Sequence, residues 1–400
     1  MRFEKELKII KKGVDELISE TEMISKLERS EKKGKPLRIK YGIDPTGYDV
    51  HIGHLVPIRK MREFQDLGHL GVIIIGDFTA QIGDPTGRDE SRPPLTGEQV
   101  RKNAEKYMDQ LYKVLDKNKT EVRWQSEWFG NMGMSDVLKL MGKFTLARFL
   151  AHDTFRNRYE QGLSLGMHEM MYPILQAYDS VAVNADVELG ATEQKFNILA
   201  GRDMQRYFGQ EQQIALLSPI LLGIDGKEKM SKSLNNYIAV FDSPKDKYGK
   251  VMSIPDESII NYFNYATKIA PEEIEEIEKQ LKNSEINPKF IKQRLAREVV
   301  SLYHGEKAAK EAEKEFNQIF AKKEIPDEMP GYELQNEKEK IIDILVKTKT
   351  CASGSEARRM IKQNAVSIDG KKVTDIFYEI SDDCIIKVGK RRFLKVIIES

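Results

Sequence analysis

Hydrophobic positions along the chain alternate between helical spacing and short continuous runs. Apolar side chains in residues 3–30 keep close to the helical repeat, which predicts an amphipathic helix. Residues 36–44 predict a strand that ends at a turn, residues 51–68 a helix closed by Gly68, and residues 70–78 a strand buried on both faces. Strand, helix and strand in close succession form a βαβ unit, so a doubly wound, Rossmann-like α/β domain with a parallel sheet is expected.

Further along, longer helical segments replace this alternation. Residues 98–183 are largely helical in pattern and predict an insertion within the α/β domain, which we place at residues 1–240. Two short apolar strands are expected around 181–187 and 213–223. Residues 241–325 are charged and helix-forming, so a separate α-helical domain is expected there.

The end of the chain predicts a small module behind a linker. Residues 326–340 contain two prolines, a glycine and few apolar side chains, which is typical of a linker. Residues 341–400 mix short helical and strand patterns and predict a small α+β domain.

Composition narrows the class of protein. The 400 residues exceed what one compact core supports, so several domains are expected. No apolar run approaches the roughly 20 residues of a membrane span, and the charged N-terminus lacks the apolar core of a signal peptide. The only two cysteines, Cys351 and Cys384, lack metal-ligand spacing. A cytoplasmic protein without a structural disulfide or a zinc site is therefore expected.

A histidine pair stands out in the stretch DPTGYDVHIGHLVP, which begins at Asp44. Thr46, His51 and His54 follow a predicted strand, and open parallel sheets bind ligands beyond the carboxyl ends of their strands. Gly53 leaves room for a flat nucleobase against the backbone. The spacing alone leaves three interpretations open: histidines that donate to phosphate near a helix N-terminus, a metal site, or ordinary surface histidines.

A second motif changes this balance. Residues 223–236 read GIDGKEKMSKSLNN and follow an apolar run. A lysine–serine run is usually a solvated loop, but here KMSKS follows HIGH in the same chain. This signature pair is similar to that of class I aminoacyl-tRNA synthetases. The resemblance implies that His51 and His54 hold the triphosphate of ATP, and it makes a dedicated metal site unnecessary.

Three further segments resemble tyrosyl-tRNA synthetases, above all the bacterial enzymes of about this length. They are IGDPTGRDESRPPL (82–95), YPILQAYDS (172–180) and GATEQKFN (190–197). The similarity covers nearly the whole chain and is strongest from residue 36 to residue 240. Tryptophanyl-tRNA synthetases share the fold and both signatures, but they carry a different segment in place of QAYD and lack the C-terminal module.

The segment around QAYD also predicts a binding stripe. Tyr172, Gln176 and Asp179 follow one another at helical spacing and lie on one helix face. The alternative is a core tyrosine beside two solvated side chains. The resemblance implies that Tyr172, Gln176 and Asp84 bind the ammonium of tyrosine, that Asp179 binds its phenol hydroxyl, and that Gln194 lines the same pocket.

One position departs from the family pattern. Many tyrosyl enzymes place a phenol-binding tyrosine four residues before the aspartate of the DPT element, where this chain has Lys40 followed by Tyr41. Because strand side chains alternate, an ungapped alignment turns Lys40 toward the pocket and Tyr41 away. A buried Lys40 is then expected to pair with Asp179. Which of Lys40 and Tyr41 contacts the substrate stays open.

The reaction that the resemblance implies needs no side-chain nucleophile. The tyrosine carboxylate attacks the α-phosphate of ATP and pyrophosphate leaves, so the protein positions the reactants and stabilises phosphate charge. Lys229 and Lys232 are expected at the pyrophosphate, and Arg88 and Arg92 form either a loop that closes over it or a solvated charged loop. Mg²⁺ is expected to arrive with ATP, without a tightly bound cofactor. The expected ATP contacts are Asp44, His51, Gly53, His54, Met230, Ser231 and Lys232.

The C-terminal module resembles the S4 RNA-binding domain through GSEARRMIKQNAVSIDGKKVTD (354–375). Ser355 is expected to cap a short helix bearing Arg358, Arg359 and Lys362, before a hairpin that turns at DGKK. Residues 338–400 hold 14 Lys and Arg against 9 Asp and Glu, so the net charge of +1 for the whole chain hides a basic tail. Motif and charge together predict contact with tRNA(Tyr).

Two questions about partners and function remain. Apolar positions of the insertion that look exposed, namely Phe144, Leu146, Phe149 and Leu150, are either core or, as the resemblance suggests, a homodimer interface. The main hypothesis is an active ligase of tyrosine and tRNA(Tyr). An RNA-binding protein that has lost catalysis would show eroded signatures, and a small-molecule nucleotidyltransferase would have no use for the basic tail.

Overall fold

The computed structural model describes residues 3–45, 50–83, 96–283, 286–323, 329–334, 338–389 and 392–397. The chain forms two compact units, Met1–Glu313 and Lys314–Ser400. In the described residues, no helix is long and apolar enough to cross a membrane.

Unit 1 is built on a six-stranded sheet of order β1-β6-β5-β2-β3-β4, in which β1 is antiparallel and the other strands are parallel. The strands are β1 (Glu16–Ile18), β2 (Arg38–Ile43), β3 (Leu70–Ile75), β4 (Thr120–Trp124), β5 (Val187–Ala191) and β6 (Ile214–Ser218). Chain order reverses between β2 and β5, which makes that boundary the switch point of a doubly wound fold. The predicted fold class is confirmed.

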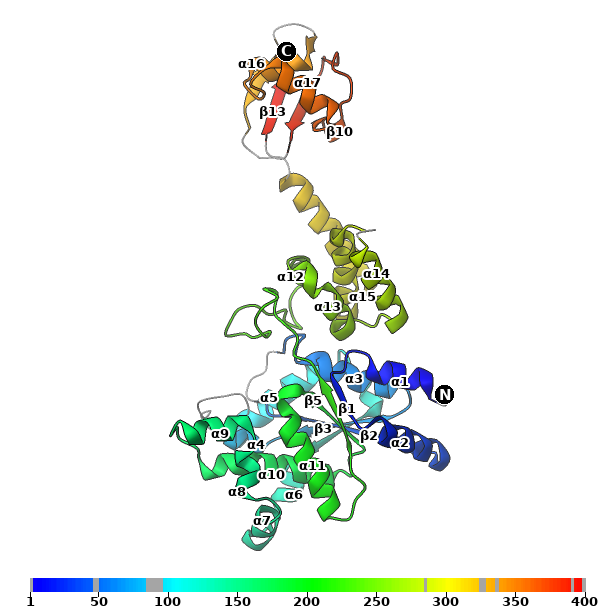
Figure 1. Cartoon of the computed structure of the whole chain (residues 1–400), viewed down its shortest axis with the longest axis vertical. Helices are drawn as coiled ribbons and strands as arrows, with labels where there is room; N and C mark the ends of the chain where they lie inside the picture. Colours follow the sequence, from blue (N-terminus) through cyan, green and yellow to red (C-terminus); the bar gives the residue numbers. More distant parts are fainter. Residues whose placement is uncertain are drawn as a thin grey trace. The chain divides into compact units, whose positions relative to one another are not determined.

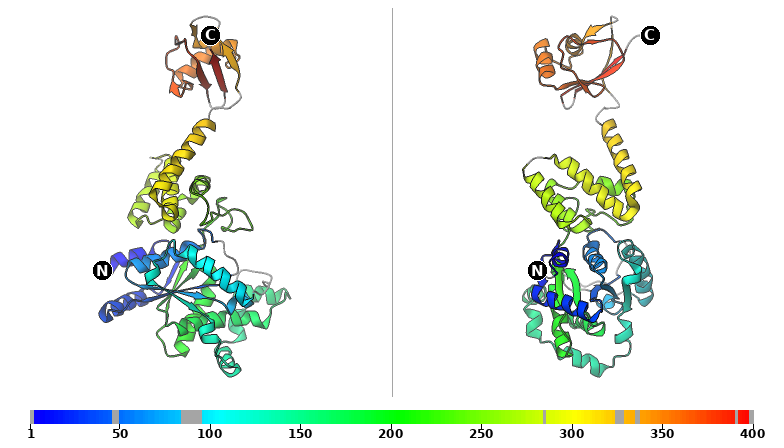
Figure 2. Two further views of the ribbon diagram at one scale, coloured as in Figure 1. Left: turned by 180° about the vertical axis from the view of Figure 1, so that it is seen from behind. Right: turned by 90° about the vertical axis from the view of Figure 1, so that its right-hand side faces the viewer.

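Helices cover both faces of this sheet (Figures 1 and 2). Helix α3 (Leu55–Asp66) packs against β2, β3 and β5, while α11 (Lys195–Tyr207) packs against β5, β6 and α10 (Met167–Ala182). The other helices before β6 are α1 (Glu4–Lys11), α2 (Glu20–Lys33), α4 (Thr79–Ile82), α5 (Gly97–Leu111), α6 (Ser126–Phe129), α7 (Met134–Met141), α8 (Leu146–Leu150) and α9 (Asp153–Glu160), with 3-10 turns at Lys117–Lys119 and Thr192–Gln194.

From Pro244 onward the described part of unit 1 is mostly helical, as the sequence predicts for residues 241–325. The helices are α12 (Pro244–Met252), α13 (Ile259–Ala266), α14 (Pro271–Lys282) and α15 (Pro288–Lys323), with a 3-10 turn at Asp256–Ser258. Helix α15 is broken at Gly305, whose φ of 83° is outside the helical region. Helix α13 packs against α3, so these helices continue one compact unit with the sheet. The predicted domain boundary near residue 240 stays a proposal.

Unit 2 is a small α+β fold, as predicted. Its sheet has the order β10-β9-β12-β13-β7, and β11 pairs separately with β8. Its core includes Ile344, Ile361 and Leu394, none of which is exposed. The elements are β7 (Gly331–Glu333), β8 (Glu339–Lys340), α16 (Ile341–Lys347), α17 (Gly354–Lys362), β9 (Val366–Ile368), β10 (Lys371–Lys372), β11 (Glu379–Ile380), β12 (Cys384–Val388) and β13 (Arg392–Ile397). Since β7 pairs with β13, residues 331–333 of the predicted linker belong to this sheet.

Several local predictions are wrong for identifiable reasons. Residues 3–30 form two helices and a strand, because Gly13 takes a φ of 62° and β1 joins the sheet beside β6. The strand predicted around 181–187 lies later in the chain: β5 begins only at Val187, and the residues before it form the end of α10 and a turn, with Val183 packed against Val72 of β3. A buried helix end and a buried strand have the same composition over so few residues.

The predicted helical insertion contains a strand, β4, which pairs with β3 at the edge of the sheet. Every residue of β4 is only partly buried, so it lacks the apolar run that marks the central strands. The predicted helix 51–68 is shorter and begins at Leu55, after His54.

For one set of side chains the structure decides between two alternatives, and at one helix cap it corrects the prediction. Phe144 and Phe149 are not exposed, because they pack with Phe155 in the core under α10, and only Leu146 of that set is largely exposed. In unit 2 the cap of α17 is Ser353, whose hydroxyl accepts from the backbone N–H of Glu356. Ser355 already lies within the helix.

Candidate active site

A cavity of about 580 Å³ opens at the switch point, where β2, β5 and β6 end. Both signatures and most of the predicted pocket line it. The predicted residues that line it are Tyr41, Asp44, His51, Gly53, His54, Tyr172, Gln176, Gln194, Lys229, Met230, Ser231 and Lys232. A second cavity, of about 870 Å³, lies among α1, α3 and residues 268–272, and none of the described site residues lines it. The first cavity is therefore the candidate active site.

Backbone pairing joins the two signatures. The N–H of Ile52 donates to the carbonyl of Ile238 at 3.0 Å, and the N–H of Val240 donates to that of Val50 at 2.9 Å. Gly53 lies against this junction, because a Cβ atom there would sit 3.0 Å from Nδ1 of His51 and 3.4 Å from Cβ of Met230. Glycine at position 53 thus permits the close approach of the HIGH and KMSKS segments.

The two histidines form one unit. Their rings stack with centroids 3.6 Å apart and planes 20° apart. His51 is buried, and its Nδ1 has no hydrogen-bond partner among the described protein atoms. Burial, His54 and Lys232 lower the pKa of His51 to about 3, so its imidazole is neutral at physiological pH. A neutral ring offers one N–H donor, which suits a phosphate oxygen.

The KMSKS segment is fixed at its base and exposed at its lysines. The N–H of Met230 donates to the carbonyl of Leu221. Asn236, which is buried, accepts from the N–H of Ser231 at 2.8 Å and donates to Asp225 at 2.7 Å. Lys229 and Lys232 are both exposed at the cavity, so they keep their hydration until a ligand binds.

The first turn after β2 positions Asp44. Its carboxylate accepts from the hydroxyl of Thr79 at 2.6 Å and from the phenol of Tyr172 at 2.9 Å. Tyr172 and Gln176 lie one turn apart on α10 and both line the cavity. The predicted stripe is therefore present at these two positions, and Tyr172 is largely buried while its hydroxyl reaches the site.

Asp179 lies deeper than the stripe predicts. It is 2% exposed, and its carboxylate accepts from Nε2 of Gln125 at 2.8 Å and from Nε1 of Trp128 at 3.1 Å. It does not line the cavity. Burial raises the pKa of Asp179 to about 7, although Lys40 and the bond from Gln125 oppose the shift.

Lys40 and Tyr41 take the opposite sides to those expected. Tyr41 lines the cavity, whereas Lys40 is fully buried beneath it. The expected pair of Lys40 with Asp179 is also wrong, because Lys40 pairs with Glu188 at 2.8 Å. Sequence reasoning missed Glu188 and Asn236. The signal for Glu188 was a single acid in the otherwise apolar strand VELGA.

The remaining predicted residues fall into two groups. Thr46, Asp84, Arg88 and Arg92 lie outside the described residues. In unit 2, Arg358, Arg359 and Lys362 are exposed on α17, opposite the buried Ala357 and Ile361. Across the described chain, no three His, Cys, Asp or Glu side chains are grouped as a metal site would need.

Comparison with known proteins agrees with this geometry. Residues 32–321 match the family model of class I tRNA synthetases (W and Y), and residues 321–396 match that of the tyrosine–tRNA ligase SYY-like C-terminal domain. The chain is 49% identical to a tyrosine–tRNA ligase of Thermotoga maritima, over 98% of this chain and 97% of that one. It is 47% identical to the tyrosine–tRNA ligase of Carboxydothermus hydrogenoformans, over 99% of this chain and 98% of that one.

The fold also resembles a solved structure, that of the tyrosyl-tRNA synthetase of Archaeoglobus fulgidus complexed with L-tyrosine. The TM-score is 0.63 at 22% identity, over 78% of this chain and all of that one. This likeness supports the fold alone, whereas the two ligases named above match over at least 97% of both chains. The chain belongs to the class I tyrosyl-tRNA synthetases.

Proposed function

We propose that this chain joins L-tyrosine to tRNA(Tyr) in two steps within the cavity at the switch point. The tyrosine carboxylate first attacks the α-phosphate of ATP, which forms tyrosyl-adenylate and releases pyrophosphate. The terminal adenosine of the tRNA then takes the tyrosyl group and releases AMP. The observation that carries the proposal is that HIGH, KMSKS, Tyr172 and Gln176 meet at one cavity. Mg²⁺ arrives with ATP, and the cytoplasm is the proposed location.

We assign the phosphate end of the cavity to the two signatures. Neutral His51 and His54 donate to phosphate oxygens, and the unpartnered, buried Nδ1 of His51 supports a ligand there. The ammonium groups of Lys229 and Lys232 stabilise the charge that builds on the leaving pyrophosphate. Because both lysines are exposed, they can approach the phosphates when ATP binds.

We assign the other end to the amino acid. The oxygens of Tyr172 and Gln176 accept hydrogen bonds from the substrate ammonium. Asp179 accepts from the phenol hydroxyl, since two donors leave its carboxylate with further lone pairs. Phenylalanine would leave this buried acceptor unpaired, which disfavours its binding.

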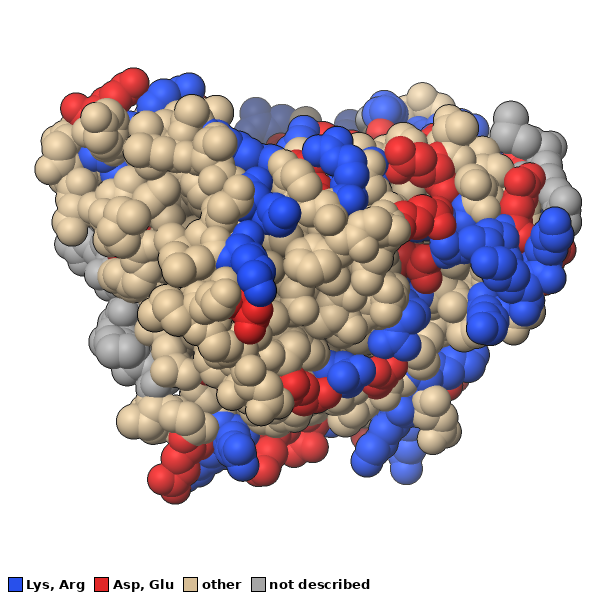
Figure 3. All heavy atoms as spheres, turned by 90° about the horizontal axis from the view of Figure 1, so that it is seen from below, with Lys and Arg blue, Asp and Glu red and all other residues tan. Residues whose placement is uncertain are grey.

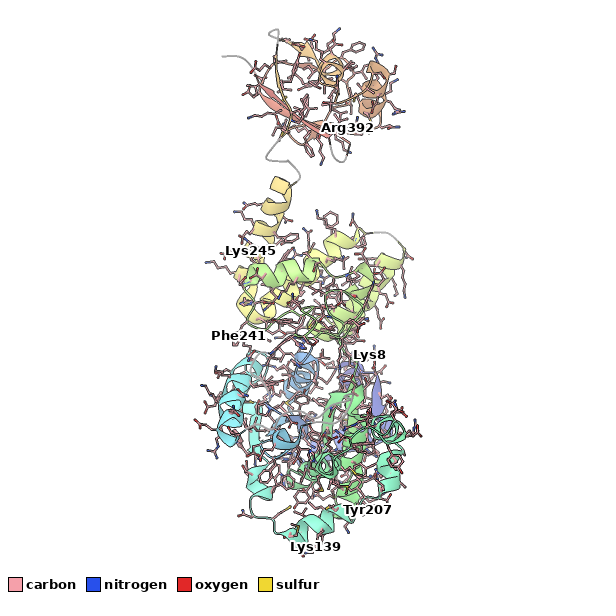
Figure 4. All side chains as sticks on the ribbon, turned by 90° about the vertical axis from the view of Figure 1, so that its left-hand side faces the viewer. Lys8, Lys139, Tyr207, Phe241, Lys245 and Arg392 are labelled. Atoms are coloured by element: carbon pink, nitrogen blue, oxygen red, sulfur yellow. The ribbon has the colours of Figure 1, made fainter. Side chains whose placement is uncertain are left out.

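We further propose a homodimer. The large exposed apolar side chains of unit 1 concentrate on the insertion and nearby helix ends: Met134, Leu138, Leu146, Tyr159, Leu163, Met167, Tyr207 and Phe208. Lys139 of α7 and Tyr207 of α11 lie at the same end of unit 1 (Figure 4). A broad area of that end carries no Lys, Arg, Asp or Glu, and the charged side chains gather toward its sides (Figure 3). Such a patch favours burial against a second copy.

Lys232→Ala is expected to slow tyrosine-dependent exchange of pyrophosphate into ATP by about 10² or more, because one transition-state donor is lost. The dissociation constant of tyrosine should change little. Lys227→Ala, a neighbouring exposed lysine that does not line the cavity, is the matched control. An equal loss in tyrosine binding and in rate would contradict the assignment. Pyrophosphate exchange that depends on tryptophan and not on tyrosine would contradict the assignment of tyrosine as the substrate.

Asp179→Asn is expected to lower the ratio of kcat/KM for tyrosine over phenylalanine at least tenfold while KM for ATP stays within about twofold. The reason is that a carboxylate acceptor becomes a neutral amide. An unchanged ratio would remove Asp179 from phenol recognition.

The same variant tests the pKa of Asp179. A carboxyl whose folded pKa is raised lowers stability as pH rises from its unfolded pKa to its folded one. The free energy of unfolding of the wild type, relative to Asp179→Asn, should therefore fall between about pH 4 and about pH 7 and stay constant above. Urea unfolding of both proteins across this pH range measures the difference. If the two free energies of unfolding change in parallel with pH, the pKa of Asp179 is not raised.

Leu138→Glu is expected to weaken the homodimer at least tenfold, because a charge is placed in an apolar contact. Sedimentation equilibrium measures the monomer–dimer constant. Phe290→Glu changes an equally exposed side chain on α15 and should leave it unchanged. A wild-type protein that stays monomeric at micromolar concentration would refute the proposed dimer.

A chain that ends at Lys323, where α15 ends, is expected to form tyrosyl-adenylate within a few fold of the full rate, since the described cavity residues all belong to unit 1. Transfer to tRNA should fall sharply, and the salt dependence of tRNA binding should flatten as phosphate contacts disappear. The double variant Arg358→Ala with Arg359→Ala should also form tyrosyl-adenylate normally, with a smaller loss of transfer to tRNA. Normal charging of tRNA by the truncated chain would refute the role of the tail.

A further inference from the structure

Two opposite charges lie in the middle of the sheet beneath the cavity. Lys40 of β2 and Glu188 of β5 are direct partners in the parallel register, and their side chains are 0% and 1% exposed. Removing such charges from water costs several kcal/mol per ion, so a buried pair rarely adds stability relative to apolar side chains. Its presence in the two strands that flank the switch point calls for another role.

The pair is fully satisfied by its neighbours. The three N–H groups of Lys40 reach Oε1 of Glu188 at 2.8 Å, the hydroxyl of Ser180 at 2.7 Å and the backbone carbonyl of Gln176 at 3.0 Å. Glu188 also accepts from the side chains of Gln176 at 3.0 Å, Ser180 at 3.1 Å and Gln213. Both charged groups are thus held by several directed hydrogen bonds, although Oε1 of Gln213 has no partner among the described protein atoms.

Close packing of α11 holds this arrangement. A Cβ atom at Gly201 would lie 2.6 Å from Nε2 of Gln213, 2.9 Å from the hydroxyl of Ser180 and 3.1 Å from Oε2 of Glu188. There is no room for a larger side chain on that side. The carboxylate of Glu188 is therefore held in place. The amide nitrogen of Gln176, which donates to this carboxylate, is held with it.

We propose that the Lys40–Glu188 pair sets the orientation of the Gln176 amide and thereby the preference of the site for an ammonium group. Because Glu188 can only accept, the amide nitrogen of Gln176 must turn toward it. The amide oxygen then faces the cavity that Gln176 lines. An inward oxygen attracts the ammonium of the amino acid, whereas an inward amide nitrogen would repel it. Lys40 and Glu188 are positioning residues, and this inference rests on the proposed binding of tyrosine.

Reversal of the pair separates positioning from stability. Lys40→Glu with Glu188→Lys keeps two opposite charges in register, but the group that faces Gln176 becomes a donor. The amide should then flip and present its nitrogen to the cavity. Reversal also removes the donor to the backbone carbonyl of Gln176, so Tm reports its cost to the fold and the ligand preference reports the positioning of the amide.

The experiment compares two ligands that differ only in the ammonium: L-tyrosine and 3-(4-hydroxyphenyl)propionic acid. Calorimetry without ATP should give the wild type at least a tenfold preference for tyrosine, as expected for a hydrogen bond to a charged group. In the reversed pair this ratio should fall at least tenfold, with a Tm within a few degrees of the wild type. A folded variant that keeps the wild-type ratio overturns the proposal.

If the reversed pair does not fold, Lys40→Met with Glu188→Gln removes both charges at similar volume. The preference of this variant for tyrosine over the propionic acid should fall severalfold, because Glu188→Gln allows both orientations of the Gln176 amide. An unchanged preference overturns the proposal. Lys26→Met removes another buried lysine, which faces Glu211 and does not line the cavity, and should leave the ratio intact. A wild-type protein that binds neither ligand would instead refute the proposed function.

Discussion

The candidate site depends on one piece of backbone pairing between distant parts of the chain. The strand-like contact of residues 50–52 with residues 238–240 places HIGH beside KMSKS, although His54 and Lys229 are 175 positions apart in the sequence. Lys247, which is fully buried, donates to the carbonyls of Ala239 and Val240 and so braces the second partner from α12. Without this contact, the two signatures would be separate loops after β2 and β6, and they would not line the same cavity.

The sequence predicted the signatures well because their chemistry is local. KMSKS follows the apolar strand β6, HIGH follows β2, which the sequence also predicts as a strand, and an open parallel sheet brings strand ends together. It predicted side-chain direction poorly where a strand is buried on both faces. Lys40 and Tyr41 both lie in β2, and the period of two leaves their faces undecided until the partner Glu188 of β5 is known.

A related limit left two aromatic residues undecided between core and interface. Phe149 lies in the short helix α8 and Phe144 just before it, where too few residues define a buried face. They are buried because Phe144 packs on Phe149, and Phe149 packs on Phe155 of α9 and on Phe196 of α11. Conversely, Met134 and Leu138 are exposed because nothing within the described chain covers their face of α7, while Leu140 of the same helix packs into the core. Tertiary contacts, rather than local composition, decide both cases.

The two ends of the cavity use opposite physical strategies. At the phosphate end Lys229 and Lys232 are exposed at the cavity, where Lys229 pairs with Glu193 and Lys232 helps to keep His51 neutral. In the proposed function both lysines turn to the triphosphate when it binds, which suits stabilisation of a transient state. At the amino-acid end Lys40 and Glu188 are both buried. In the proposed function they hold the amide of Gln176, a neutral acceptor, in one orientation. In the proposed function, a neutral acceptor that cannot rotate discriminates by direction. The fold thus separates selection of the amino acid from activation of the phosphate within one cavity.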